Sequence, residues 1–187
     1  MKRFTETTAV IAAALMASSA TVAADDSFSG LYIGAEGGFD STTFGGAKDN
    51  TRYLGGLLGF RYQMDSNMVL GIEGTYGNSG YSGSGGFDFS TPDFGNEWTA
   101  SGLLGFAFGD DNDNLVFAKV GYTQTKFDII DNDTDAVTSG DVTGLRFGGG
   151  YERKFGDILS VRLSVDYSKP ESFFKQLQAK AGLLVSF

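Results

Sequence analysis

The sequence predicts an all-β protein, an eight-stranded antiparallel up-and-down transmembrane β-barrel. Three observations lead to this fold class: a closing strand that alternates apolar and polar residues, an export signal at the start, and eight segments with the same alternation. Strands of a membrane barrel alternate between lipid and lumen, and roughly 10 residues suffice for each to cross the bilayer.

The start of the chain has the features of a secretory signal peptide. Lys2 and Arg3 supply the positive charge, residues 9–17 (AVIAAALMA) form a short apolar run, and small residues follow. The apolar run is too short for a membrane-spanning helix, which needs about 20 residues. We expect cleavage after Ala24, with Ala23 as the alternative.

The expected domains are a signal peptide, 1–24, and one outer-membrane β-barrel domain, 25–187. The 163 residues of the second part are enough for a single domain. With 12 basic and 22 acidic residues, this part has a net charge of −10, which argues against a nucleic-acid partner. The chain has no Cys and no His, so it has neither disulfides nor imidazole chemistry.

The first four predicted strands cover 31–39, 54–62, 68–76 and 98–108, and each has one apolar face. In chain order these faces are Leu31, Ile33, Ala35, Gly37 and Phe39; Leu54, Gly56, Leu58, Phe60 and Tyr62; Met68, Leu70, Ile72, Gly74 and Tyr76; and Trp98, Ala100, Gly102, Leu104, Phe106 and Phe108.

The last four predicted strands cover 116–122, 143–151, 159–167 and 177–187, with the same alternation. Their apolar faces are Val116, Ala118, Val120 and Tyr122; Thr143, Leu145, Phe147, Gly149 and Tyr151; Leu159, Val161, Leu163, Val165 and Tyr167; and Leu177, Ala179, Ala181, Leu183, Val185 and Phe187.

The opposite faces of the strands hold the charges. Because a charge facing lipid at mid-bilayer costs about 2–4 kcal/mol, we expect these side chains to fill the lumen as an ion-pair network. We expect Glu36 to pair with Lys180, and Glu73 to pair with Arg61 or Lys119. The ten predicted lumen charges are five acids and five bases: Glu36, Arg61, Glu73, Glu97, Lys119, Arg146, Glu152, Arg162, Asp166 and Lys180.

Connections between the strands alternate in length. Short turns are expected around 65–67, 109–114 and 154–157, and longer loops at 40–53, 77–97, 123–142 and 168–176. In outer-membrane barrels the short turns are periplasmic and the long loops face outward. We therefore expect both termini to be periplasmic and four loops to lie at the cell surface.

Aromatic residues fall at the ends of the predicted strands. Such rings favour the two headgroup interfaces of a membrane, so we expect two girdles. One girdle comprises Tyr62, Phe108, Tyr151 and Phe187, and the other comprises Phe39, Tyr76, Trp98, Tyr122 and Tyr167.

The signal peptide, the opening strand GLYIGAEGGF (30–39) and the closing AGLLVSF (181–187) resemble the porin-like, opacity-type family of small outer membrane β-barrels of Gram-negative bacteria. Its small members, such as outer membrane protein X and the barrel of outer membrane protein A, have eight strands. The resemblance implies that the last strand, with Leu183, Val185 and Phe187, is read by the barrel-assembly machinery. It implies no shared activity, since a fold does not fix a function.

Enzymatic and metal-dependent functions find little support in the residues. Outer-membrane barrel enzymes use His, which is absent, and Glu36 with Glu73 is better explained by salt bridges than by acid–base catalysis. The segment 131–141 starts like a calcium loop, with Asp131, Asp133 and Asp135, but lacks the required Gly and Glu. We therefore expect no enzyme activity, cofactor or metal site.

The predicted function is a structural or surface-interaction role: adhesion, recognition or envelope stability. Expected partners are outer-membrane lipid, including lipopolysaccharide, and the assembly machinery, with the chain a monomer. A surface ligand would bind at 78–96 and 128–141. Two alternatives stay open: a narrow porin-like channel for small solutes or ions, and a soluble periplasmic lipid-binding barrel with its apolar face inside.

Overall fold

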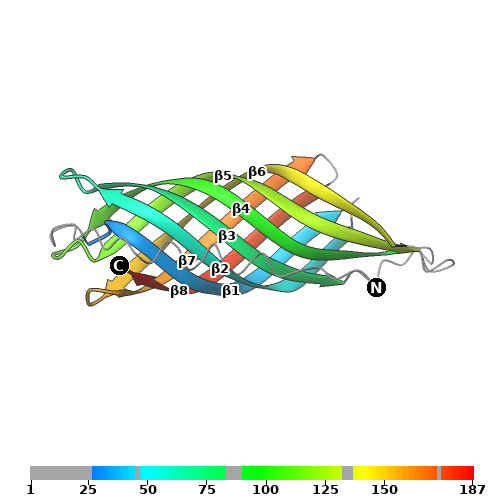
Figure 1. The fold of residues 1–187 in the computed structure, drawn as a ribbon, viewed down its shortest axis with the longest axis horizontal. Helices are drawn as coiled ribbons and strands as arrows, with labels where there is room; N and C mark the ends of the chain where they lie inside the picture. The colour runs from blue at the N-terminus through cyan, green and yellow to red at the C-terminus, as the bar shows by residue number, and fades with distance from the viewer. Residues whose placement is uncertain (1–26, 45–46, 83–89, 132–136, 172–173) are drawn as a thin grey trace, which may run out of the picture.

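A computed structural model of the chain describes residues 27–44, 47–82, 90–131, 137–171 and 174–187. These residues form a closed antiparallel barrel in which each strand pairs with its neighbours in the sequence and β8 pairs with β1 (Figure 1). The strands are β1 (Gly30–Phe44), β2 (Ala47–Gln63), β3 (Met68–Ser82), β4 (Ser90–Phe108), β5 (Asn114–Asp131), β6 (Val137–Phe155), β7 (Leu159–Glu171) and β8 (Phe174–Ser186). The predicted fold class is confirmed.

The strands are longer than the alternation predicted, so the predicted extent of the loops was wrong. Most of 40–53, 77–97, 123–142 and 168–176 continues the strands as paired hairpins. The alternation weakens there because a strand with polar surroundings on both faces has no lipid side to keep apolar, whereas backbone pairing continues regardless of side chain.

The two ends of the barrel differ. At the turn end, which we define as the end holding the C-terminus and Phe28, three short turns join β2 to β3, β4 to β5 and β6 to β7. Asn67 has φ 62° and Gly109 has φ 101°, values that Asn and Gly adopt at little cost in tight reversals. At the opposite hairpin end the strands extend furthest (Figure 1).

At the hairpin end the closed wall divides into two pairs of hairpins. Pairing between β2 and β3 stops at Leu54 and Asn78, and pairing between β6 and β7 stops at Arg146 and Ser168. The β8–β1 and β4–β5 ladders extend further along the chain. Hairpins β7–β8 and β1–β2 therefore stay joined on one side, and β3–β4 and β5–β6 on the other.

The apolar face of the wall points outward. Leu58, Leu104 and Leu163 are 45%, 49% and 56% exposed, as expected for residues that meet lipid. This arrangement is the reverse of a soluble lipid carrier, which would hold these leucines at its centre. Among the described residues, no helix is long and apolar enough to cross a bilayer.

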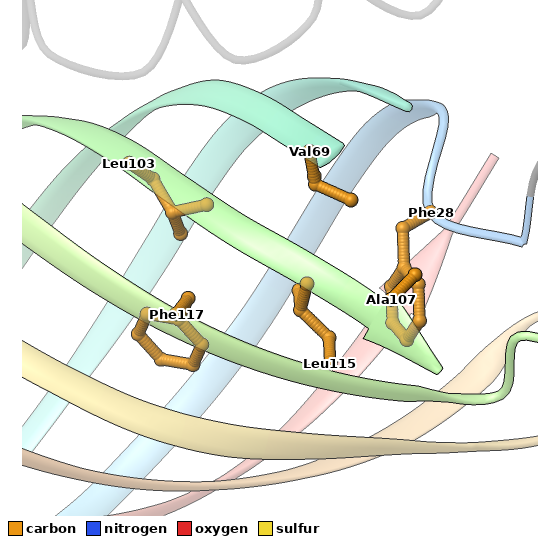
Figure 2. Close-up of a cluster of buried hydrophobic side chains, with 6 residues drawn as sticks. All are labelled: Phe28, Val69, Leu103, Ala107, Leu115 and Phe117. Carbon is orange, nitrogen blue, oxygen red and sulfur yellow. The ribbon is translucent and has the colours of Figure 1, made fainter. Parts of the chain in front are cut away.

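A small apolar cluster fills the lumen near the turn end (Figure 2). Its members come from the segment before β1 and from β3, β4 and β5: Phe28, Val69, Leu103, Ala107, Leu115 and Phe117. The backbone N–H of Phe28 donates to Oε1 of Gln63 at 3.1 Å, and Lys154 Nζ donates to the carbonyl of Ser27. Ser27 and Phe28 therefore cover this end of the lumen.

Candidate functional site: the lumen network and the hairpin end

All eight strands contribute charge to the lumen. The ten predicted lumen residues all lie inside the barrel, with 0 to 7% of each residue exposed. The structure thus brings together every side chain that the alternation assigned to the interior. By strand they are Glu36 (β1), Arg61 (β2), Glu73 (β3), Glu97 (β4), Lys119 (β5), Arg146 and Glu152 (β6), Arg162 and Asp166 (β7), and Lys180 (β8).

Nearest the apolar cluster, arginines and glutamates alternate in a chain of contacts. Arg61 Nη1 lies 2.9 Å from Glu152 Oε2, and Arg162 Nη2 lies 2.8 Å from the same oxygen. Arg162 also pairs with Glu73. Glu152 therefore contacts guanidinium groups from β2 and β7, and Arg162 links it to Glu73 on β3.

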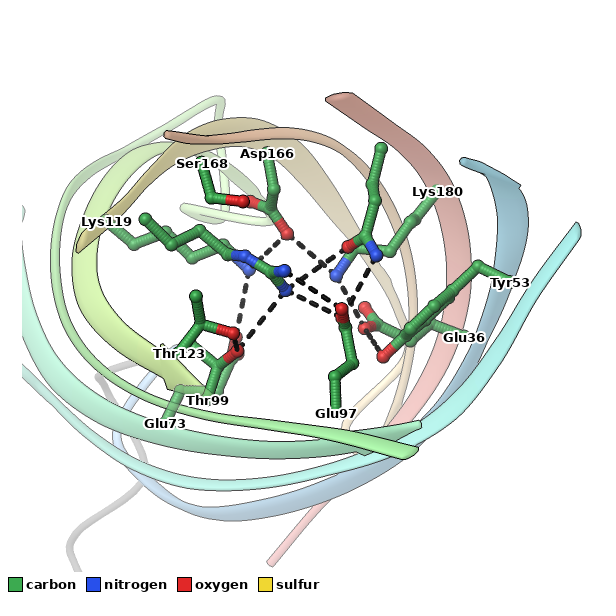
Figure 3. A network of polar contacts seen from close by, with 12 residues as sticks. Glu36, Tyr53, Glu73, Glu97, Thr99, Lys119, Thr123, Asp166, Ser168 and Lys180 are labelled. Carbon is green, nitrogen blue, oxygen red and sulfur yellow. Dashed lines mark hydrogen bonds and ion pairs between the residues drawn. The ribbon is translucent and has the colours of Figure 1, made fainter. Parts of the chain in front are cut away.

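The chain of ion pairs continues through two lysines toward β1 (Figure 3). Lys119 Nζ lies 3.3 Å from Glu73 Oε1 and 3.2 Å from Asp166 Oδ2. Lys180 Nζ lies 2.7 Å from Asp166 Oδ2 and 2.7 Å from Glu36 Oε1. Positive and negative groups alternate along the whole series, so each cation in it has a carboxylate partner.

Two buried tyrosines donate further hydrogen bonds to carboxylates of this ion-pair series. The Tyr32 hydroxyl donates to Glu73 at 2.9 Å, and the Tyr53 hydroxyl donates to Glu36 at 3.1 Å. The Tyr32 ring fits because Gly59 has no side chain, since a Cβ there would lie 2.3 Å from the ring carbon Cζ. The glycine-rich composition thus makes room for large polar side chains in a narrow lumen.

A second cluster lies toward the hairpin end. Arg146 Nη1 and Nη2 donate to the two oxygens of Glu97 at 2.7 and 3.0 Å, a bidentate pair. Gln176 and Gln178 donate to both Glu97 and Asp40, at 2.6 to 3.2 Å. This cluster joins four strands, β1, β4, β6 and β8.

Of the two partners expected for Glu73, the structure confirms Lys119 and not Arg61, which pairs with Glu152. Glu73 also pairs with Arg162, a contact that was not predicted. Asp40, which was expected to lie in a loop, is fully buried as a sixth lumen acid beside five bases among the described side chains. The signal for Asp40 was available, because it continues the inward phase of Glu36.

The predicted girdle residues all lie on the outer face, where each is an exposed aromatic. At the hairpin end, the Trp98 and Tyr122 rings are 6.2 Å apart, and Trp98 Nε1 donates to Gln124 at 2.9 Å. At the turn end, Phe108 and Tyr151 rings are 6.4 Å apart. Phe155, which the alternation did not single out, is exposed at the same end.

The last strand closes the barrel between β7 and β1. Leu183, Val185 and Phe187 point outward, and Phe187 is 74% exposed. The Phe187 N–H donates to the carbonyl of Leu31 at 2.8 Å. The residues expected to guide assembly therefore sit at the seam of the closed sheet.

The two hairpin pairs at the hairpin end carry opposite charge. We call β7–β8 with β1–β2 the basic hairpin pair and β3–β4 with β5–β6 the acidic hairpin pair. Within 40–53 and 168–178 the bases are Lys48, Arg52, Lys169 and Lys175, and the acids besides buried Asp40 are Asp49 and Glu171. Within 79–97 and 123–145 the one base is Lys126, and the acids besides buried Glu97 are Asp88, Asp93, Asp128, Asp131, Asp133, Asp135 and Asp141.

The segment that resembles a calcium loop is only partly described. Asp131 ends β5, while Asp133 and Asp135 lie outside the described residues. Within the described ranges, no group of three or more acidic, His or Cys side chains is placed to hold a metal ion. In the range 78–96, Tyr81 and Phe94 are paired in the β3–β4 register, and Phe87 and Phe89 lie outside the described residues.

Comparisons with known proteins agree with this geometry. The Ail protein of Yersinia pestis superposes with a TM-score of 0.65 at 17% identity, covering 85% of this chain and 99% of that one. Neisserial surface protein A gives 0.60 at 13% (85% and 98% covered), and the N-terminal barrel of Pseudomonas aeruginosa OprF gives 0.54 at 14% (83% and 97% covered). These likenesses show the fold. No curated protein sequence matches the chain.

The family assignment comes from the sequence match. The family model of the outer membrane protein beta-barrel domain matches residues 10–187, nearly the whole chain. An outward apolar wall, exposed aromatic residues at both ends of the wall and a polar interior are the features that suit a β-barrel to an outer membrane. The chain therefore belongs to the outer membrane protein beta-barrel domain family and is an integral outer-membrane β-barrel.

Proposed function

We propose that this protein is a structural, non-enzymatic barrel that holds four hairpins at the cell surface for adhesion, recognition or envelope stability. The observation that carries the proposal is the lumen network, in which charged side chains from all eight strands are buried and paired. Carboxylates that are sealed inside and held by cations cannot reach a substrate. The interior therefore serves rigidity, and interaction falls to the hairpins.

In this proposal the hairpin end faces outward, and the turn end and both termini are periplasmic. The alternation of short turns and long hairpins supports this orientation. The signal peptide, 1–24, is removed during export, and the last strand with Leu183, Val185 and Phe187 is the segment recognised by the assembly machinery. The mature chain functions as a monomer.

The acidic hairpin pair is the proposed interaction surface. It contains the two regions expected to bind a ligand, 78–96 and 128–141, and the sequence gives it seven acids outside the lumen against one base, Lys126. Strand pairing such as Tyr81 with Phe94 extends this pair beyond the point where β2 and β3 separate. A paired and charged projection can contact a partner at a distance from the membrane.

Shortening one hairpin tests the proposed role. We would remove residues 79–95 and join Asn78 to Asn96, which pair in the register, with an Asn-Gly turn. The matched control removes 43–48 from the basic pair and joins Thr42 to Asp49 in the same way. Both variants should reach the outer membrane, but only the first should lose surface binding, serum survival or detergent resistance. Equal behaviour of both variants in all three assays contradicts the role of the acidic pair.

The orientation of the barrel can be tested by cysteine labelling, because the sequence contains no Cys that would give background labelling. A membrane-impermeant maleimide applied to intact cells should label Asp141→Cys at the hairpin end and should not label Ser66→Cys at the turn end. Both positions are exposed. The reverse pattern contradicts the proposed orientation.

A further inference from the structure

The outer face of the basic hairpin pair carries four exposed cations that neither the lumen network nor the proposed interaction surface uses. They come from three strands: Lys48 and Arg52 from β2, Lys169 from β7 and Lys175 from β8, with β1 between β8 and β2. All four are on the outward phase of their strands, next to buried neighbours such as Tyr53, Ser168 and Gln176.

The register gathers these cations into one patch. Lys175 and Lys48 both pair with Thr43 of β1, one from each side. Ser168 pairs with Gln176 immediately before a register shift, so Lys169 and Lys175 both follow this pair toward the hairpin end. Because neighbouring strands are about 4.8 Å apart, the three lysines lie close together around the wall.

Arg52 adds a second level to the patch. It pairs with Phe39 of the hairpin-end girdle and lies four residues below Lys48 on β2, which corresponds to about 13 Å along an extended strand. The patch thus extends from the girdle outward, across the depth at which lipid head groups meet an outer-membrane barrel.

The charge of the patch is opposite to that of the rest of the chain. The part after the signal peptide has a net charge of −10, yet in 40–53 and 168–178 four bases stand beside only two acids outside the lumen, Asp49 and Glu171. Lys126 on the acidic pair, in contrast, has Asp141 as its register partner. A local excess of positive charge on a strongly acidic protein indicates an anionic partner.

Toward the bilayer centre from the patch, β8 and β1 carry several small outward residues. Ala179 and Ala181 of β8 pair with Phe39 and Gly37 of β1, and on the other side of β8 they pair with Val165 and Leu163. Ala35 follows on β1, so these small outward residues form a strip beside larger ones such as Phe39. This strip runs toward the bilayer centre from the same two strands that bear Lys175 and Thr43.

We propose that the β7–β8–β1–β2 face binds a phosphorylated glycolipid of the outer leaflet, the lipid A part of lipopolysaccharide. Its phosphates accept hydrogen bonds from the lysines and Arg52, and its acyl chains lie against Ala179, Ala181 and Gly37. This inference rests on the proposed orientation, because the patch faces the outer leaflet only if the hairpin end points outward. Binding at this site would determine which face of the barrel contacts the glycolipid.

The test titrates diphosphorylated lipid A into the purified mature barrel in zwitterionic detergent and counts bound lipid by native mass spectrometry. The variant Lys48→Gln/Arg52→Gln/Lys169→Gln/Lys175→Gln should weaken binding on the order of 500-fold, since each basic residue near a membrane surface contributes about 1 kcal/mol, or roughly fivefold. The control variant Lys126→Gln, also exposed, should bind as the parent does. Gel mobility before and after heating confirms that each variant is folded.

Two further probes separate the head-group contact from the acyl contact. Ala181→Phe should weaken binding of lipid A about tenfold and leave binding of the phosphorylated disaccharide without acyl chains unchanged. Dephosphorylated lipid A should bind the parent as weakly as it binds the fourfold variant. Equal affinity for the phosphorylated and dephosphorylated lipids, or an equal loss in Lys126→Gln, overturns the proposal.

The labelling of Asp141→Cys and Ser66→Cys distinguishes failure of this inference from failure of the proposed function. Labelling at the hairpin end together with no phosphate-dependent binding overturns the lipid site alone. Labelling at the turn end overturns the orientation, and with it the lipid site.

Discussion

Single side chains inside this barrel act through the partners that they share. Arg162 contacts both Glu73 and Glu152, and its guanidinium lies over the Phe117 ring at 4.9 Å. Removing such a residue leaves two buried carboxylates without a cation, which costs more than the original pair contributed. The lumen therefore depends on balance among its charges and not on the strength of one pair.

The first prediction concerns this balance. Arg162→Met should lower the free energy of unfolding by about 3–5 kcal/mol because Glu73 and Glu152 lose a shared partner. Arg153→Met, at an arginine with a 55% exposed side chain and a 3.7 Å contact to Asp113, should change it by less than about 1 kcal/mol. Urea titrations in lipid vesicles, followed by the fluorescence of the single tryptophan, Trp98, measure both. Equal losses in the two variants contradict a balanced lumen.

The second prediction concerns the lipid face. Ile72 is 68% exposed and lies midway along the outward row from Met68 to Tyr76. Ile72→Arg should cost about 2–4 kcal/mol, and Tyr76→Arg at the girdle only about 0–1 kcal/mol, because water reaches the interface and not the bilayer centre. The same vesicle titrations decide this, and a larger cost at Tyr76 than at Ile72 would place the membrane elsewhere on the barrel.

At the scale of elements, β8 is the strand that completes the sheet. Its pairing with β1 and β7 removes the two edges that an open sheet would expose. Until that closure, the β8 backbone and its outward row of Leu183, Val185 and Phe187 are free to add to another sheet. An assembly factor that captures this strand would act at the last step of folding.

The third prediction follows for the end of β8. Deletion of Phe187 should reduce the amount of folded protein in the outer membrane several-fold, without lowering expression. Phe155→Ala, which removes another exposed aromatic at the turn end, should leave that amount nearly unchanged. Heat-modifiable migration on gels of membrane fractions gives the measurement. Normal assembly of the deletion variant removes the role proposed for the terminal aromatic.

At the scale of the whole molecule, successive groups of side chains fill the interior from one end of the barrel to the other. An apolar cluster with Phe28 lies at the turn end, a continuous run of ion pairs follows, and the Arg146–Glu97 cluster lies toward the hairpin end. Eight strands enclose an interior just wide enough for side chains, and here those side chains are large. A rigid support for surface hairpins fits this filling better than a route for solutes.

The fourth prediction is that the purified barrel shows no discrete conductance steps in planar bilayers. Arg146→Ala, which removes the guanidinium that donates to Glu97, Gln176 and Gln178, should not create a wide pore either, because the apolar cluster and the remaining ion pairs still fill the lumen. Regular steps in the parent that change with Arg146→Ala would favour the narrow-channel alternative.

The sequence alone determined the fold class, the outward and inward faces, and the ten charges of the interior. It could do so because lipid excludes charge so strongly that every second residue of a membrane-spanning strand is uncharged. Glu36 with Lys180 was even paired correctly, because β1 and β8 must meet when the barrel closes.

Only the tertiary structure decided the partners across the lumen, the inclusion of Asp40 and the length of the hairpins. Contacts such as Arg61 with Glu152 depend on the tilt and stagger of the strands, which bring residues from opposite walls to the same height. The cationic patch was hidden for the same reason, since Lys48 and Lys175 are far apart in the chain and meet only through Thr43 of β1.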